Sequence, residues 1–166
     1  KENIIKRDAG KNGQGIALTP KGKEILHQTY MQLQHFFIVH KKSTITGRAI
    51  EGVGEGRYYM SQQGYKNQFR QKLGYVPYEG TLNLRVSPTT GNAVYNNPTF
   101  FRIEGFSTKD RNFGGLRCKK VLINGTIQGA IIIPDRTAHN AETIELIAVF
   151  SLRQKLKLKN GGLVRV

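Results

Sequence analysis

Short apolar runs with a period of two dominate the chain from residue 45 onward. Alternating apolar and polar positions are typical of half-buried strands, and residues 82–86 show the pattern most clearly, as Leu-Asn-Leu-Arg-Val. The expected strands lie at 45–49, 82–86, 99–105, 116–123, 126–133, 144–150 and 163–166. Asn124 and Gly125 predict a two-residue hairpin turn between two of them. Six or seven strands with few helices in about 120 residues indicate a mainly β fold, a small barrel rather than a layered α/β sheet.

The apolar period becomes helical in the N-terminal part and again after residue 60. Thr19 can cap a helix whose first residue is Pro20, a position that suits proline. Its expected apolar face consists of Leu26, Tyr30, Leu33 and Phe37. A short helix carries Tyr65, Phe69 and Leu73 and ends at Gly74, and a helical turn is expected at 152–156. Residues 1–16 are polar, and within them residues 8–15 are expected to form a mobile turn or loop; residues 87–98 are expected to form a second loop.

The charge of the chain is strongly positive. Among 166 residues, 26 are Lys or Arg and 11 are Asp or Glu, which gives a formal net charge of +15. Residues 1–42 hold 8 basic and 3 acidic residues, and residues 43–166 hold 18 and 8, so both parts are basic. This balance favours a polyanionic partner, either a nucleic acid or a nucleotide. We expect two domains, at 1–42 and 43–166.

Cysteine usage and hydropathy indicate the compartment. The single cysteine, Cys118, excludes an intrachain disulfide framework and a multi-cysteine zinc site, which favours a reducing cytoplasmic setting. No run of eighteen apolar residues occurs, so no membrane span is expected. The chain begins at Lys1 without an initiating methionine, and we expect further residues upstream.

The run from Leu18 to Leu26 resembles the step from the wing into the last helix of winged-helix transcription regulators. The resemblance covers about ten residues and implies that the N-terminal segment is part of a DNA-binding domain, with its recognition helix upstream of Lys1. A helical extension or linker that packs on the main domain is the alternative interpretation.

A glycine-rich stretch is the first candidate binding element, and it reads Gly52, Val53, Gly54, Glu55, Gly56, Arg57. Alternate glycines allow a close approach of backbone N–H groups to a ligand, and the arginine adds a fixed positive charge, so the stretch is a plausible anion cradle. It is neither the Walker phosphate loop nor the dinucleotide fingerprint, because the spacings differ. A glycine-rich hairpin turn is the alternative.

Two polar groups follow on later strands. Thr81 and Asn83 are two residues apart, so they share one strand face, where their uncharged oxygens could hold a metal that arrives bound to phosphates. An ordinary polar outer face is the alternative. Residues 134–145 form a polar loop that ends at Glu145, a carboxylate inside an apolar run. In that loop, His139 is expected to be a surface histidine. Elsewhere in the chain, Cys118 lacks an evident base, so covalent catalysis is not expected.

Taken together, three motifs resemble the archaeal CTP-dependent riboflavin kinases over about residues 45–166. They are residues 52–58, residues 74–84 and the series Gly129 to Pro134, Thr137, His139, Glu142, Glu145. The resemblance implies a six-stranded cradle-loop barrel in which residues 52–57 bind the nucleotide and Thr81 and Asn83 hold Mg²⁺. It further implies that Thr137 and Glu145 contact the flavin. Nucleotide contacts are also implied for Phe150, Ser151, Leu152 and Arg153. Family members carry Pro and Lys where this chain has Val149 and Ser151.

Two functions of different classes follow. The first is an enzyme that converts riboflavin and CTP into FMN and CDP with Mg²⁺, in which Glu145 orients or deprotonates the ribityl hydroxyl. The second is a flavin- or nucleotide-sensing DNA-binding regulator, with the barrel as effector domain of the N-terminal segment. The two are compatible in one chain.

Overall fold

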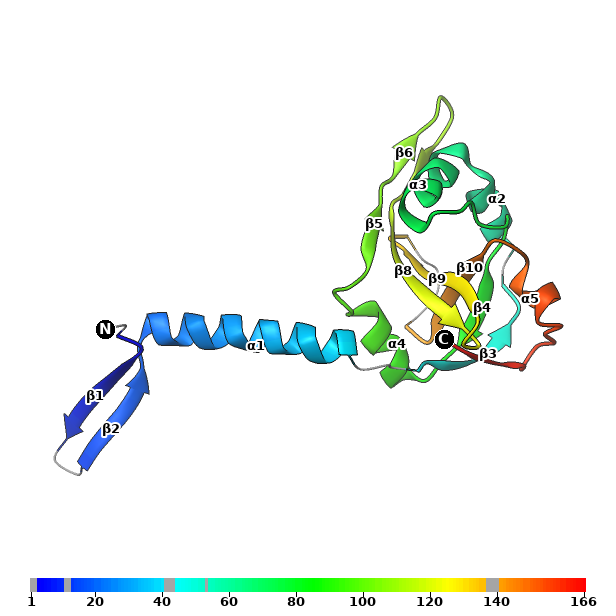
Figure 1. Cartoon of the computed structure of the whole chain (residues 1–166). Helices are drawn as coiled ribbons and strands as arrows, with labels where there is room; N and C mark the ends of the chain where they lie inside the picture. Colours follow the sequence, from blue (N-terminus) through cyan, green and yellow to red (C-terminus); the bar gives the residue numbers. More distant parts are fainter. Residues whose placement is uncertain (1–2, 11–12, 41–43, 53, 137–140) are drawn as a thin grey trace. The chain divides into compact units, whose positions relative to one another are not determined.

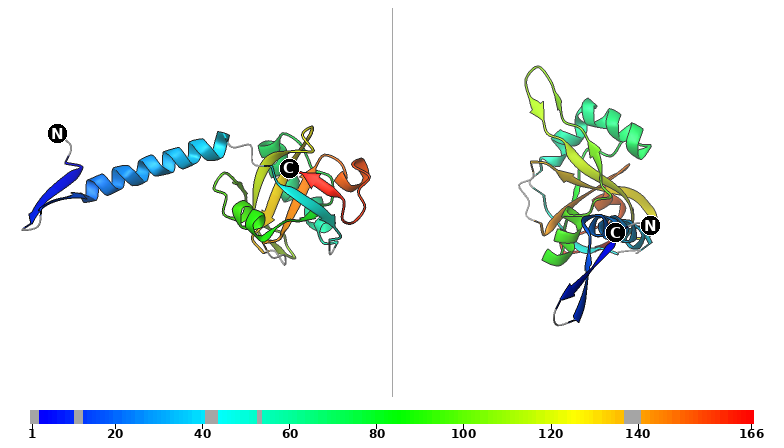
Figure 2. Two further views of the ribbon diagram at one scale, coloured as in Figure 1. Left: turned by 90° about the horizontal axis from the view of Figure 1, so that it is seen from below. Right: turned by 90° about the vertical axis from the view of Figure 1, so that its left-hand side faces the viewer.

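The computed structural model describes residues 3–10, 13–40, 44–52, 54–136 and 141–166. The chain divides into two compact units, Lys1–Ser43 and Thr44–Val166 (Figure 1, Figure 2). Each unit is described by itself below. None of the helices in the described ranges is long and apolar enough to cross a bilayer.

The first unit is a β-hairpin followed by a helix. Strands β1 (Ile5–Gly10) and β2 (Gly13–Leu18) pair antiparallel, and α1 spans Pro20–His40. The predicted cap is confirmed, because the Gly22 amide donates to Thr19 Oγ1 at 3.1 Å. The expectation of a loop over residues 8–15 is wrong, because the described residues among them belong to β1 and β2. These strands have no apolar side for periodicity to detect, as Ile5 and Ile16 are both exposed.

The second unit is built on a seven-stranded antiparallel sheet with the strand order β11-β3-β4-β10-β9-β8-β5. The strands are β3 (Thr46–Ile50), β4 (Leu82–Arg85), β5 (Phe101–Ile103), β8 (Leu116–Ile123), β9 (Ile127–Pro134), β10 (Thr143–Ala148) and β11 (Leu163–Arg165). The mainly β prediction is therefore confirmed. The sheet curls so that the Asn124 amide donates to the Arg165 carbonyl at 2.7 Å, but the described strand pairs do not close it into a barrel.

Both faces of the central strands are buried. Ile131 belongs to a cluster with Leu84, Ile144 and Leu146, whereas its neighbour Ile132 belongs to a second cluster. Since successive side chains of a strand point to opposite faces, β9 contributes to two cores at once. The second core is completed by Phe69 and its neighbours on the helical layer.

The helical layer consists of α2 (Gly56–Ser61) and α3 (Gln63–Leu73). The prediction of α3 and of its end is confirmed, because Gly74 adopts the left-handed conformation with φ 89° and its amide donates to the Arg70 carbonyl. A small hairpin of β6 (Phe106–Ser107) and β7 (Asn112–Phe113) lies beside α3 (Figure 1, Figure 2). Sequence periodicity does not reveal α2 or this hairpin.

Two further elements flank the sheet. The expectation of a loop over residues 87–98 is wrong, because they contain α4 (Pro88–Tyr95). Ser87 caps it by accepting from the Thr90 amide, and proline occupies its first turn, so the signals are those that locate α1. The short helix α5 (Leu152–Lys155) lies where the sequence predicts a helical turn. At the β8–β9 turn, Ile123 pairs with Ile127, so Thr126 belongs to the connection rather than to the strand. The expected two-residue turn is therefore wrong by one residue, because three residues connect the strands.

Candidate active site

A cavity of about 650 Å³ in the second unit brings together most of the predicted site residues. Its lining includes Gly52, Gly54, Glu55, Gly56 and Arg57 from the glycine stretch, together with Thr81, Asn83 and Glu145. Tyr78, Glu79 and Gly80 connect these groups along the rim. The glycine stretch is not a hairpin turn, because it leads into α2, which begins at Gly56.

The glycine stretch packs directly on Thr81, which precedes β4, and on Asn83, the second residue of that strand. A Cβ atom added to Gly56 would lie 2.7 Å from Thr81 Oγ1, and one added to Gly52 would lie 2.6 Å from Asn83 Nδ2. Any larger residue at either position would displace the polar side chain beside it. Gly54 is required for a different reason, since its φ of +85° is a conformation that other residues rarely adopt. The alternate glycines thus have separate physical roles.

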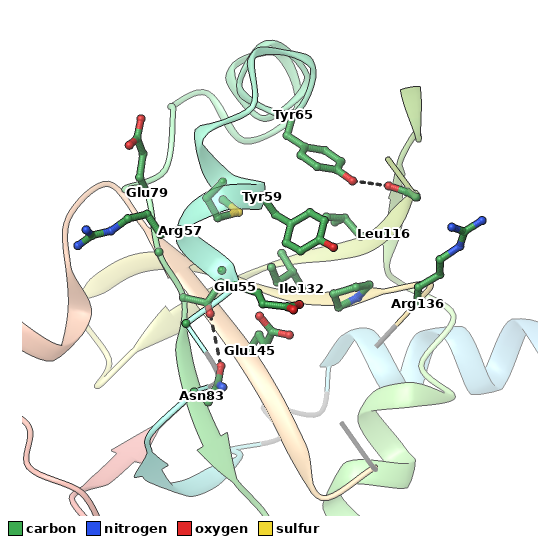
Figure 3. A pocket seen from close by; sticks show the side chains of 18 of the residues that line it. Glu55, Arg57, Tyr59, Tyr65, Glu79, Asn83, Leu116, Ile132, Arg136 and Glu145 are labelled. Carbon is green, nitrogen blue, oxygen red and sulfur yellow. Dashed lines mark hydrogen bonds between the residues drawn. The ribbon is translucent and has the colours of Figure 1, made fainter. Parts of the chain in front are cut away.

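Three neighbouring strands place the polar side chains at the floor of the cavity. Glu145 of β10 pairs with Asn83 of β4 on one side and with Ile132 of β9 on the other. Asn83 is buried, with 5% of its surface exposed, and Thr81 Oγ1 lies 3.4 Å from its Oδ1. Figure 3 shows Asn83 and Glu145 at the same end of the cavity. A hydroxyl, an amide and a carboxylate therefore lie close together in the cavity.

The donor set suits a metal ion that arrives with its own ligands. Thr81 and Asn83 supply hard but uncharged oxygens, which hold Mg²⁺ best when phosphates provide most of its coordination. Within the described ranges, no group of three or more His, Cys, Asp or Glu could hold a metal ion alone. The chemistry of this floor therefore fits a metal–phosphate complex rather than a protein-only metal site.

The other end of the cavity is aromatic and apolar. Tyr59 and Met60 of α2, Tyr65 of α3, Leu116 of β8 and Ile132 of β9 line it (Figure 3). The Tyr65 hydroxyl donates to the Gly114 carbonyl, and burial raises the pKa of Tyr65 above its usual value. A wall of this composition accommodates a flat, largely apolar ring.

Arginines approach this end from the β6–β7 hairpin and from the end of β9. Arg111 and Arg136 both line the cavity. Behind this wall, Arg102 holds Asp135 by two hydrogen bonds of 2.5 and 2.6 Å, which lower the pKa of that carboxyl. The Asp135 amide also donates to the Gly115 carbonyl at 3.0 Å. The ion pair thus joins β5 to the residue after β9, and the backbone hydrogen bond joins that residue to the one before β8.

Several predicted residues do not line the cavity or lie outside the described residues. Ser151 caps α5, and Leu152 is buried in the core. The cavity lining contains none of the four predicted residues Phe150, Ser151, Leu152 and Arg153. Arg153 donates to the Ile50 carbonyl at 2.7 Å, so it contacts the backbone just before the glycine stretch. Val53, Thr137 and His139 lie outside the described residues. The nucleotide contacts of Phe150–Arg153 stay a prediction.

The aromatic end is the part of the site that sequence reasoning missed. The helical period marks Tyr65 only as an apolar position, and it does not assign Tyr59 to a helix at all. Arg111 and Arg136 belong to polar stretches in which nothing distinguishes them from other surface cations. The sequence offers one signal, the adjacent pair Gly114 and Gly115, both of which line the cavity. Paired glycines indicate a close approach, and a Cβ added to Gly115 would lie 2.2 Å from Arg102 Nη2.

Comparison with known proteins gives first the class and then the family. The chain is 45% identical to a riboflavin kinase of Archaeoglobus fulgidus, over 99% of this chain and 71% of that protein. It is 40% identical to a riboflavin kinase of Methanosarcina acetivorans, over 96% and 68% of the two chains, and 35% identical to one of Thermoplasma volcanium, over 100% and 76%. These relatives make the chain an enzyme of the kinase class.

The particular family follows from a second comparison. The family model of CTP-dependent riboflavin kinases, which is described as a domain of unknown function, DUF120, matches residues 49–166. The chain therefore belongs to the CTP-dependent riboflavin kinase family. The match covers the helical layer, every residue that lines the cavity, and the sheet except for the first residues of β3. The resemblance found in the sequence motifs is confirmed.

Proposed function

We propose that this chain transfers the γ-phosphate of CTP to the ribityl 5′-hydroxyl of riboflavin, giving FMN and CDP, with Mg²⁺ as cofactor. The observation that carries the proposal is the contact of Gly52 and Gly56 with Asn83 and Thr81 inside a cavity that also holds Glu145. A close backbone approach, neutral oxygen donors and a carboxylate are the parts that phosphoryl transfer to an alcohol requires.

The nucleotide is bound at the glycine end. Gly52, Gly54 and Gly56 let the backbone approach the phosphates, with Arg57 as a nearby positive charge. Thr81 and Asn83 would hold Mg²⁺, which when bound neutralises phosphate charge and aligns the transferred group. Val53 and the segment Phe150–Arg153 are further nucleotide contacts, as the family resemblance implies. Arg153 also supports the start of the glycine stretch through the Ile50 carbonyl.

The flavin occupies the aromatic end, with its ribityl chain directed at the floor. Glu145 lies between Asn83 and Ile132, where the two ends of the cavity meet. Its carboxylate orients the 5′-hydroxyl and accepts its proton as the new bond to phosphorus forms. Thr137, which lies outside the described residues, is the second flavin contact that the resemblance implies.

The direct test is product formation. Riboflavin is incubated with Mg²⁺ and either CTP or ATP, and the flavins are separated by chromatography. We expect FMN with CTP, and a clear preference for CTP over ATP. Absence of FMN with any nucleotide would remove the enzymatic proposal.

Three variants test the site assignment. Thr81→Val and Asn83→Ala each remove one neutral oxygen donor, and we expect both to raise the Mg²⁺ concentration needed for half-maximal rate. Glu145→Gln removes the proton acceptor but keeps the side-chain shape, so it should lower kcat with little effect on the Mg²⁺ requirement. Full turnover by Glu145→Gln would exclude this carboxylate as the base.

A second candidate function is favoured by the first unit. We propose that it is part of a winged-helix DNA-binding domain, so that the chain combines a kinase with a regulator. The supporting observation is the β1–β2 hairpin, with exposed Lys6 and Arg7, that leads into the Thr19-capped helix α1 in the order of a wing and a last helix. A gel-shift titration on the DNA that lies upstream of the protein's own gene, at several salt concentrations, tests this second function. Binding that is salt-sensitive and blind to sequence would count against a regulator.

A further inference from the structure

Arg111 is held in the cavity wall by aromatic rings rather than by a carboxylate. Its guanidinium carbon lies 5.2 Å from the ring centre of Tyr58, 5.6 Å from that of Tyr59 and 5.7 Å from that of Phe113. One terminal nitrogen, Nη2, donates to the Tyr59 hydroxyl at 3.1 Å. Cation–π contacts of this kind fix the plane of a guanidinium without neutralising its charge.

The hairpin that carries Arg111 is itself anchored on α3. Phe106 and Phe113 stack across it with ring centres 4.8 Å apart, and a Cβ added to Gly64 would lie 2.6 Å from the Phe106 ring. The Tyr65 hydroxyl donates to Gly114 directly after the hairpin. These contacts restrict the position of the hairpin, so the guanidinium is preorganised beside the aromatic end.

Most donors of Arg111 remain available. A guanidinium carries five N–H donors, and one of them reaches the Tyr59 hydroxyl. Across the described part of the chain, the ion pairs involve Lys66 and Arg102, and none involves Arg111. A planar, charged fork with free donors therefore faces a cavity whose adjoining wall is apolar.

We propose that Arg111 recognises the flavin ring and determines specificity for it. The inference rests on the proposed riboflavin kinase function. The isoalloxazine ring carries two carbonyl oxygens on its pyrimidine edge, which can accept hydrogen bonds from a planar fork. The dimethylbenzene part of the ring is apolar and packs against Tyr59, Leu116 and Ile132.

The position of Arg111 favours a contact with the flavin ring over a contact with the nucleotide phosphates. All three aromatic contacts of Arg111 are with Tyr58, Tyr59 and Phe113, and Figure 3 shows Tyr59 beside Leu116, above the end where Asn83 and Glu145 lie. The nucleotide end already has its own arginine, Arg57, next to the glycine stretch. Arg111 is therefore a binding residue for the acceptor substrate.

The test separates ring recognition from turnover. Binding of riboflavin and of lumiflavin, which has the same ring without the ribityl chain, is measured by fluorescence titration on the full chain. The variants are Arg111→Gln and Arg111→Lys, with Lys109→Gln as the matched control, because Lys109 is exposed on the same hairpin and does not line the cavity. Circular dichroism verifies folding, and Tyr59→Phe, which removes only the hydroxyl contact, provides a milder perturbation of Arg111.

We expect Arg111→Gln to weaken both flavins by roughly 10- to 100-fold, the range of hydrogen bonds to a charged group. Arg111→Lys should recover only part of this loss, because a lysine lacks the planar fork. Tyr59→Phe should cause a smaller loss in the same direction. The KM for CTP should stay within about twofold, and Lys109→Gln should behave as the wild type.

Two results would overturn the inference: lumiflavin affinity of Arg111→Gln within twofold of the wild type, or a loss confined to the KM for CTP. Failure of the proposed function would look different. In that case the wild-type chain itself would produce no FMN, whatever its affinity for the flavin ring.

Discussion

Because Gly56 packs closely against Thr81, the effect of Gly56→Ala on stability and on rate tests this packing. Gly56 begins α2, and replacing a helical glycine with alanine normally stabilises a protein by about 1 kcal/mol. Here the added Cβ would lie 2.7 Å from Thr81 Oγ1 and 3.3 Å from the Thr81 backbone nitrogen. Unstrained contact requires roughly 3.5 Å, so Thr81 must move by close to an ångström. A displacement of that size in an active site can cost about 100-fold in rate.

We therefore expect Gly56→Ala to lower kcat by roughly 10- to 100-fold and to raise the Mg²⁺ requirement. The assay is the initial rate of FMN formation across a Mg²⁺ titration at saturating substrates. Gly125→Ala is the matched control: Gly125 has φ +77° with open space around it, in the β8–β9 turn. It should lose about 1–2 kcal/mol of stability, or roughly 2–8 °C in Tm, at full activity. A Gly56→Ala protein that is more stable than the wild type and fully active would refute the close packing.

Three further predictions concern the rest of the second unit. The Tyr75 hydroxyl is buried without a hydrogen-bond partner among the described residues, and burial raises its pKa to about 12, so Tyr75→Phe should be neutral or stabilising by up to about 1 kcal/mol in urea unfolding. Burial likewise raises the pKa of Cys118 to about 12, so a thiol reagent at about pH 8 should label the unfolded chain but not the native one. The hydrogen bonds from Arg102 lower the pKa of Asp135, so this pair stabilises the fold above the ordinary pKa of 3.8, and the stabilisation is lost as pH falls through the lowered value. Arg102→Gln should therefore cost less than about 1 kcal/mol at pH 7, because the pair is partly exposed, and the difference from wild type should shrink as the pH falls below 3.8; a difference that does not change with pH would contradict it.

The strands β3, β8 and β11 were predictable because their burial alternates with a period of two, whereas β9 and β10, which are buried on both faces, were predictable only as short apolar runs. The sequence locates β8 to the residue at both ends, since Asn124 and Gly125 fix its end and both adopt the positive φ that a tight turn needs. The curvature of the sheet was not predictable. It depends on the contact between Asn124 and Arg165, which are 41 residues apart in the chain.

The candidate site was predictable where backbone chemistry leaves a mark in the sequence. Alternate glycines and a Thr-x-Asn spacing are visible in the residues themselves and indicate a constraint, whereas the aromatic end leaves no such mark. Tyr65 packs as an ordinary core residue of α3 and also lines the cavity, and one pattern cannot distinguish the two roles. Arg111 depends on rings from three positions, Tyr58, Tyr59 and Phe113, of which two lie more than fifty residues before it.

The register of β10 against β4 gives a reason for the amide at position 83. Glu145 lies directly opposite Asn83, in a cavity that Glu55 also lines. An aspartate at 83 would place two carboxylates on facing positions, and one of them would take up a proton at neutral pH. An amide oxygen avoids this conflict but coordinates metal weakly, which suits the proposed function, in which the nucleotide would bring the ion with its own phosphates. Under the proposed function the metal and the phosphoryl donor would enter together, and the carboxylate would serve the acceptor hydroxyl.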